Sequence, residues 1–202
     1  MMILVNTVKQ YMKQTIAIFS LVLVCLLLQA CGPVLLGGAA TGAAVINDKR
    51  TTGTFVEDEA IELKIRKVLL EDVSLKDITH INATSFNTNV LLTGEAVSEG
   101  TRQKVFQIVK NTPKVGHIFN EIAIAAPSAL LARSSDTLLT SNVKTRLIAD
   151  KVVDGSKIKV VTEAGVVYLM GIISRDNGTA AAMIASRASG VQKVVKLFEY
   201  VD

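Results

Sequence analysis

The chain has 202 residues, 50% of them hydrophobic, and its 22 Lys and Arg against 18 Asp and Glu give a net charge of +4. Trp is absent, aromatic residues make up only 4%, and the basic residues are scattered. A nucleic-acid binder usually gathers its cations on one face and adds stacking aromatics. We therefore expect no nucleic-acid partner.

The N-terminal segment has the pattern of a bacterial lipoprotein signal. Lys9 and Lys13 precede an apolar run of about 14 residues that ends at Leu28, whereas a membrane-spanning helix needs roughly 20. The run continues into Gln29, Ala30 and Cys31, a small residue followed by cysteine. This order predicts cleavage before Cys31 and attachment of acyl chains, palmitate among them, to that cysteine.

Two alternatives stay open at this end of the chain. The apolar run could be an uncleaved membrane anchor with an incidental cysteine. Translation could start at Met12 rather than Met1, because Met12 opens a signal of ordinary length. Cleavage would also remove Cys25, so that Cys31 would be the only cysteine left and no internal disulfide could form.

The composition along the chain predicts five segments. Residues 1–30 are the removed signal, and residues 31–56 carry the lipidated cysteine and a flexible tether rich in Gly and Ala. Residues 57–125 and 136–202 are two small domains, and residues 126–135, which include Pro127, form a linker. The mature chain would be close to neutral, with 20 basic side chains (22 less Lys9 and Lys13) against 18 acidic ones.

The two domains are predicted because the second half of the chain repeats the first. The matching segments are 64–66 with 144–146, 90–94 with 167–171, and 115–120 with 191–196. A single repetition at this length indicates a duplicated domain rather than a solenoid, which needs at least three units.

Each copy has the periodicity of an αββαβ unit. In the first copy we expect a helix with the apolar stripe Ile61, Ile65, Val68 and Leu69, then strands at 78–83 and 90–96, a helix at 99–110 and a strand at 115–124. In the second we expect a helix at 137–150, strands at 157–162 and 166–173, a helix at 175–187 and a strand at 191–201.

This order resembles the BON domain, named for bacterial OsmY and nodulation proteins. The motifs that carry the resemblance are NVLLTG, ending at Gly94, and VVYLMG, ending at Gly171, each followed by a helix and a Val-rich last strand. The resemblance implies an α+β fold of two tandem BON domains, each a small mixed three-stranded sheet with two helices. With the lipoprotein signal in front, the chain is similar to dual BON-domain lipoproteins of the outer membrane, anchored on its periplasmic face.

The sequence contains no recognisable catalytic or metal-binding motif, and we expect neither enzymatic activity nor a cofactor. His80 and His117, the only histidines, fall on predicted strands of the first copy, where a surface or strand-edge role is more common than zinc ligation. Gly94 and Gly171 lie near strand ends, and we interpret both as structural.

The two first helices differ in charge. From Glu57 to Asp72 six acidic residues against three basic ones sum to −3, whereas from Asp136 to Lys151 two acidic residues against three basic ones sum to +1. Near an anionic bilayer each Lys or Arg contributes about 1 kcal/mol, so only the second helix suits phospholipid. Leu138 and Ile148 lie off its predicted core stripe, where they either form an interfacial wedge or pack against the other domain.

In the family that the chain resembles, the second BON domain binds anionic phospholipid through this helix and helps to place the protein at division sites. The resemblance therefore implies binding of phosphatidylglycerol or cardiolipin. The implied lipid-binding residues, with the helix cations, are Leu138, Asn142, Lys144, Thr145, Arg146, Ile148 and Lys151.

The leading hypothesis is thus a non-enzymatic lipoprotein, held in the membrane by its acyl chains, that maintains cell-envelope integrity. The rival hypothesis is a protein-interaction adaptor for outer-membrane assembly or cell-wall machinery. A third, a membrane-damaging haemolysin, is disfavoured because the mature sequence has no amphipathic or spanning segment long enough to form a pore.

Overall fold

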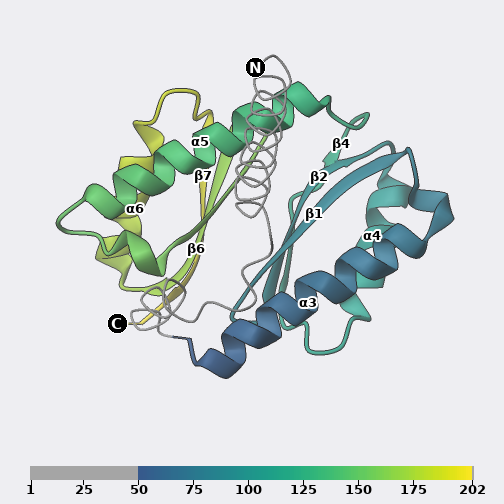
Figure 1. Ribbon diagram of the computed structural model, residues 1–202, viewed down its shortest axis with the longest axis horizontal. Helices are drawn as coiled ribbons and strands as arrows, with labels where there is room; N and C mark the ends of the chain where they lie inside the picture. The colour runs from purple at the N-terminus through teal and green to yellow at the C-terminus, as the bar shows by residue number, and fades with distance from the viewer. Residues whose placement is uncertain (1–49, 202) are drawn as a thin grey trace, which may run out of the picture. The chain divides into compact units, whose positions relative to one another are not determined.

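The computed structural model describes residues 50–201, and the predicted signal, Cys31 and most of the tether lie outside them. Two αββαβ units follow one another in the described chain (Figure 1). The first consists of α3 (Thr52–Glu71), β1 (Thr79–Phe86), β2 (Asn89–Ala96), α4 (Glu99–Lys110), β3 (Ile118–Asn120) and β4 (Ala123–Ile124). The second consists of α5 (Leu130–Ala149), β5 (Lys159–Glu163), β6 (Val166–Ile173), α6 (Arg175–Ser186) and β7 (Lys193–Tyr200). Short 3-10 turns, η2 (Val73–Leu75) and η3 (Gly155–Lys157), follow α3 and α5.

The strands of each unit form a mixed sheet, as predicted. β1 pairs with β2 antiparallel, and β2 pairs parallel with β3 and β4. In the second unit β5 pairs antiparallel with β6, which pairs parallel with β7. Two-residue turns close both hairpins, with positive φ at Asn87 and Thr88 in the first and at Ala164 and Gly165 in the second. Such turns match the twist of paired strands.

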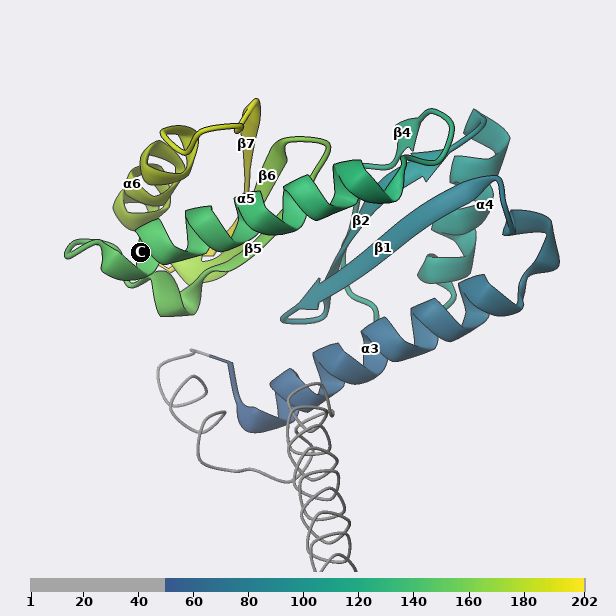
Figure 2. The ribbon, with the colours of Figure 1, turned by 45° about the horizontal axis from the view of Figure 1, so that its top comes forward.

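The helices of each unit cover one face of its own sheet, with α3 beside β1 and α5 beside β5 (Figure 2). In the first unit the fully buried Ile61, Ile65, Val90 and Leu92 lie in this layer, together with Val105 and Val109 of α4. In the second unit the corresponding positions are Val143, Leu147, Val167 and Leu169, with Ala181 and Ala185 of α6. Every second residue of the central strand therefore points toward the helices.

The opposite faces of the two sheets share a third apolar cluster. Leu91 of β2 and Tyr168 and Met170 of β6 are buried in it, next to Phe86 at the end of β1. Leu91 and Tyr168 hold the same place in the matched segments 90–94 and 167–171. Both αββαβ units, within residues 50–201, accordingly belong to one compact body.

The other strand ends differ from the sequence prediction by at most three residues, and three differences are larger. α3 and α5 begin several residues earlier than expected, and α5 takes in residues 130–135 of the predicted linker, where nothing after Pro127 interrupts the helix. The predicted strand 115–124 is two short strands, because the Asn120 side chain accepts the Ile122 N–H at 3.4 Å in place of a ladder bond.

The break in this strand lies beside Gly94, whose φ is +106°. A Cβ at that position would lie 1.9 Å from the His80 carbonyl oxygen, so only glycine fits the β1–β2 approach. At Gly171 a Cβ would lie 2.8 Å from the Lys157 carbonyl oxygen, and β7 beside it is unbroken. Both glycines thus have the structural role that we expected.

The match between 64–66 and 144–146 does not hold in space. Ile65 is fully buried, whereas Thr145, its partner in the sequence match, is exposed. Ile61 and Ile65 occupy the same core positions as Val143 and Leu147. The structural alignment of the two helices is therefore shifted by two residues from the sequence match. The sequence match therefore aligns charged residues of the two helices but not their buried residues.

Candidate functional site

The outer face of α5 carries the apolar residues predicted to touch lipid. Leu138 is 72% exposed and Ile148 is 59% exposed, whereas Val143 and Leu147 are fully buried against the sheet. The sequence left open whether Leu138 and Ile148 pack against the other domain, and the structure shows that they do not. These two side chains are available to an external partner.

Polar residues lie between these two. Asn142 and Thr145 are exposed, and the Arg146 Nε donates to the Asn142 Oδ1 at 2.7 Å. The Thr145 hydroxyl donates to the Ser141 carbonyl oxygen at 2.9 Å, a bond within the helix. Arg146 and Lys151 are both exposed, so their positive charges accompany the apolar residues. We define Leu138, Asn142, Thr145, Arg146, Ile148 and Lys151 as the α5 outer face.

Lys144 differs from the other predicted lipid-binding residues. It is half-buried, and its Nζ donates to the carbonyl oxygens of Gly155 at 2.8 Å and Ile158 at 2.5 Å. The ammonium thereby joins α5 to the η3 turn. An ammonium held on two carbonyl oxygens has lost much of its capacity to reach a head group.

The loop after α5 extends the apolar surface. Val152, which the sequence argument missed, is 74% exposed. The Asp150 carboxylate accepts the Val152 and Val153 N–H groups at 2.8 and 3.0 Å, which lowers the pKa of Asp150 and fixes the loop next to Ile148. An Asp two residues before a valine at a helix end is the local signal that could have shown this turn.

The first helix of the other unit, α3, has a different outer face. Val56, Leu63 and Leu70 recur every seven residues and are 62%, 60% and 79% exposed. Several of its carboxylates have partners within the chain: Glu57 pairs with Lys114, and the Glu62 Oε1 lies 2.8 Å from the Lys159 Nζ. The helix thus combines an exposed apolar stripe with acids that are largely neutralised.

Asp58 of α3 is a buried acceptor that the sequence analysis did not single out. It is 2% exposed and accepts from the Arg50 Nη1 at 2.7 Å, the Ser85 hydroxyl at 2.7 Å, and the Asn87 and Thr88 N–H groups at 2.9 and 2.8 Å. Four donors on one carboxylate explain how it is tolerated in the interior. Its role is to hold the β1–β2 turn against α3.

His80 does not lie alone. It stands opposite Glu95 in the hairpin register, and its Nδ1 lies 3.2 Å from the Glu95 Oε2. Glu163 at the end of β5 joins them, so that one ligand atom from each residue lies within 4.8 Å of the others. Within residues 50–201 this is the one group that meets the geometric requirement for a metal site. His117 lies elsewhere, with its ring 4.6 Å from the Phe119 ring.

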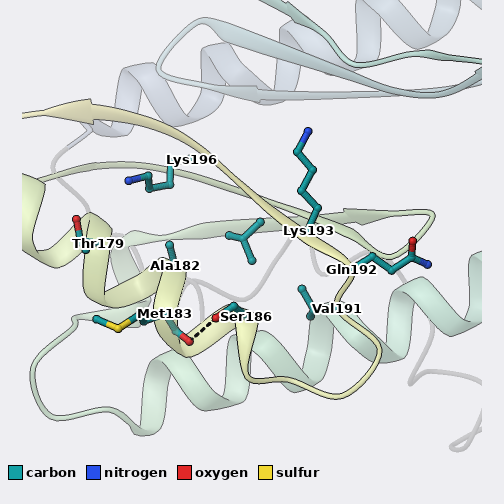
Figure 3. A pocket seen from close by; sticks show the side chains of 9 residues that line it. Thr179, Ala182, Met183, Ser186, Val191, Gln192, Lys193 and Lys196 are labelled. Carbon is teal, nitrogen blue, oxygen red and sulfur yellow. Dashed lines mark hydrogen bonds between the residues drawn. The ribbon is translucent and has the colours of Figure 1, made fainter.

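An open hollow also lies between α6 and β7 (Figure 3). Its volume is about 450 Å³, and Lys193 and Lys196 of β7 line it together with Met183 of α6. The Ser186 hydroxyl donates to the Met183 carbonyl oxygen at 2.9 Å, the dashed line in Figure 3. No carboxylate or histidine lines it, so it offers no base for a nucleophile.

No helix within residues 50–201 combines the length and the apolar character that crossing a membrane requires.

Comparison with known proteins gives a match to the BON domain over residues 57–126 and 135–202. The outer membrane lipoprotein DolP of Haemophilus influenzae is 35% identical over 87% of this chain and 91% of its own. A 21 kDa hemolysin of Actinobacillus pleuropneumoniae is 34% identical over 77% of this chain and 80% of its own. The osmotically-inducible protein Y of Escherichia coli is 27% identical over 77% of this chain and 78% of its own.

Proposed function

The chain is an outer-membrane lipoprotein of the BON domain family, and from that premise we propose that it maintains envelope integrity without catalysing a reaction, by binding anionic phospholipid through its second BON domain. The observation that carries the proposal is the α5 outer face, where Leu138 and Ile148 are exposed beside Arg146 and Lys151. Exposed aliphatic side chains next to cations are what an interfacial helix needs.

Attachment to the membrane and choice of lipid are separate tasks in this proposal. Acyl chains on Cys31 supply attachment, since burial contributes about 0.8 kcal/mol per CH₂ group and two chains give stable anchoring. The α5 outer face then biases where the anchored protein dwells, including at division sites. Lys144 contributes to the position of α5 through the Gly155 and Ile158 carbonyls rather than to the lipid contact.

The test of lipid binding uses the whole mature chain with Cys31→Ser, so that no acyl chain is attached. Co-sedimentation with vesicles of phosphatidylcholine alone, or with phosphatidylglycerol or cardiolipin added, should show binding that requires the anionic lipid. Leu138→Ser with Ile148→Ser should weaken it at least about tenfold, because each side chain loses roughly 1 kcal/mol or more of apolar burial.

The chain offers a matched control on its other first helix. Leu63→Ser with Leu70→Ser removes two aliphatic side chains of similar exposure from α3 and should leave vesicle binding unchanged. If the α3 variant loses binding as much as the α5 variant does, the α5 outer face is not the lipid-binding element.

Anchoring is tested separately in cells. Cys31→Ala in the full precursor should release the protein from the membrane fraction into the soluble periplasm. A variant protein that still sediments with membranes would contradict the lipidation of Cys31. Sensitivity of a deletion strain to detergent and to large antibiotics, with and without the α5 variant, connects lipid binding to envelope integrity.

The α3 helix favours a second candidate function, an adaptor for outer-membrane assembly proteins. Its exposed stripe, Val56, Leu63 and Leu70, lies on a helix several of whose carboxylates have partners within the chain. Under this candidate Leu63→Ser with Leu70→Ser reduces site-specific cross-linking to the assembly machinery and the α5 variant does not.

A further inference from the structure

The cluster of His80, Glu95 and Glu163 combines ligands from both BON domains. His80 on β1 and Glu95 on β2 belong to the first, and Glu163 on β5 belongs to the second. The Glu95 side chain is 9% exposed and His80 is 18% exposed, so both are largely shielded from water. Two carboxylates held this close favour a cation between them.

The fold itself does not need these side chains. By the match of residues 90–94 with 167–171, the places of His80 and Glu95 are taken in the second domain by Lys157 and Ile172. Ile172 packs against the apolar cluster between the sheets, and Lys157 forms an ion pair with Asp154 at 2.9 Å. The same hairpin is therefore built with no acid and no imidazole at these two places.

The donor set is one that a divalent transition metal prefers. One imidazole and two carboxylates are common zinc ligands, and metal–ligand distances of about 2.0 to 2.2 Å place neighbouring ligand atoms roughly 3.3 Å apart in a tetrahedron. The 3.2 Å between the His80 Nδ1 and the Glu95 Oε2 already has this length. Glu163 has to approach by at most about 1.5 Å, given the 4.8 Å limit of the cluster.

Further contacts orient the ligands. The Asn82 Nδ2 donates to the Glu163 Oε2 at 3.0 Å, and the Ser128 N–H donates to the Glu95 Oε2 at 3.3 Å. Hydrogen bonds of this kind hold metal-binding carboxylates in place. Arg133 and Lys159 line the same hollow as His80 and Glu163, but Arg133 donates to the Ser128 carbonyl oxygen at 2.7 Å and Lys159 pairs with Glu62 at 2.8 Å. Both cations thus bind acceptors other than the two ligand carboxylates.

We propose that His80, Glu95 and Glu163 bind one divalent transition-metal ion of the zinc class, which links the two BON domains. The ion binds the His80 tautomer that carries its ring proton on Nε2, so that the Nδ1 lone pair is free to coordinate, and a fourth coordination position is left for water. Because a ligand comes from each domain, the ion stabilises their contact as well as the first hairpin.

Isothermal titration of the metal-free mature chain with zinc chloride tests this, with Cys31→Ser present because thiolates also bind zinc. The parent should bind one zinc per chain and neither magnesium nor calcium at the same concentration. His80→Gln and Glu163→Gln should each weaken binding at least about 100-fold. His117→Gln, which removes the other histidine, should bind zinc as the parent does.

Thermal unfolding separates a bridging ion from one held by the first domain alone. Zinc should raise the melting temperature of the parent and of His117→Gln, and the rise should disappear in Glu163→Gln, whose new amide still accepts from Asn82. Melting curves without zinc show whether each variant is folded. A parent that binds no zinc, or a Glu163→Gln protein that binds and is stabilised as the parent is, overturns the proposal.

Discussion

The first helices of the two BON domains, α3 and α5, have the same place against their sheets and both expose aliphatic side chains, but their charged residues have different partners. Carboxylates of α3 bind partners within the chain: Asp58 accepts from the first hairpin turn, and Glu62 pairs with Lys159. α5 leaves Leu138 and Ile148 exposed beside Arg146. The difference shows that the inner stripe of a duplicated helix is constrained by its sheet, whereas the outer face is free to diverge.

The largest effect on this comparison should come from Asp58→Ala. The substitution removes one carboxylate partner of the largely buried Arg50 and the acceptor of three hydrogen bonds at the first hairpin, so the free energy of unfolding should fall by about 3 to 5 kcal/mol. Urea unfolding followed by circular dichroism measures it.

Asp136→Ala is the matching change on α5. Asp136 is half-buried and accepts the Ala164 and Gly165 N–H groups at the second hairpin turn, so about 1 kcal/mol should be lost. Equal losses in the two variants would mean that the two hairpins depend on their helix carboxylates to the same degree.

Gly94→Ala should have the next largest effect. The new Cβ meets the His80 carbonyl oxygen and the backbone has a φ of +106°, so the loss should exceed about 2 kcal/mol. Gly171→Ala, whose Cβ has a longer approach to the Lys157 carbonyl oxygen and no positive φ, should lose less. Thermal unfolding of the two variants side by side gives the order, and the reverse order would contradict this account.

Lys144→Met and Arg146→Met distinguish a structural cation from a surface cation on one helix. Loss of the Lys144 ammonium removes a charged donor from the Gly155 and Ile158 carbonyl oxygens and should cost about 1 to 3 kcal/mol of stability. Arg146→Met should change stability by less than about 0.5 kcal/mol and weaken vesicle binding instead. A Lys144→Met protein of parental stability would return this residue to the lipid-binding set.

The smallest effect concerns Tyr168, whose counterpart in the first domain is Leu91. Burial, with the nearby Glu121 carboxylate, raises the pKa of Tyr168 to about 12. The folded state therefore favours the neutral phenol, so its contribution is complete below the unfolded pKa near 10 and is lost as the pH rises toward 12. Tyr168→Phe should remove this part of the alkaline loss, as measured by urea midpoints at pH 8 and 11. Parallel losses in the two proteins would exclude Tyr168 as a cause.

Much of the fold followed from local patterns. Alternation and turn residues predicted the hairpins, and α4 has the bounds that its periodicity indicated. The last strand of the first domain was wrong as one continuous strand, because the Asn120 side chain and the twist at Gly94 interrupt a ladder that the Val and Ile content alone would continue. Boundaries that depend on a single side-chain bond are not visible in a hydrophobic pattern.

Parts of the candidate sites were within reach of the sequence as well. A two-residue turn at Asn87 and Thr88 places His80 opposite Glu95, so this pair could have been found by counting back from the turn. The positions of Leu138 and Ile148 around the helix predicted that they lie off the core stripe. The sequence could not predict whether the other domain covers them.

The sequence by itself determined the duplication, the order of elements and the charge difference between the two first helices, because all three are written in local composition and spacing. Only the tertiary structure decided that Glu163 of the second domain joins His80 and Glu95, and that the Lys144 ammonium is held by two backbone carbonyls. These contacts join residues from different elements. Their geometry depends on how two sheets and a helix pack, and no single segment of the chain carries that information.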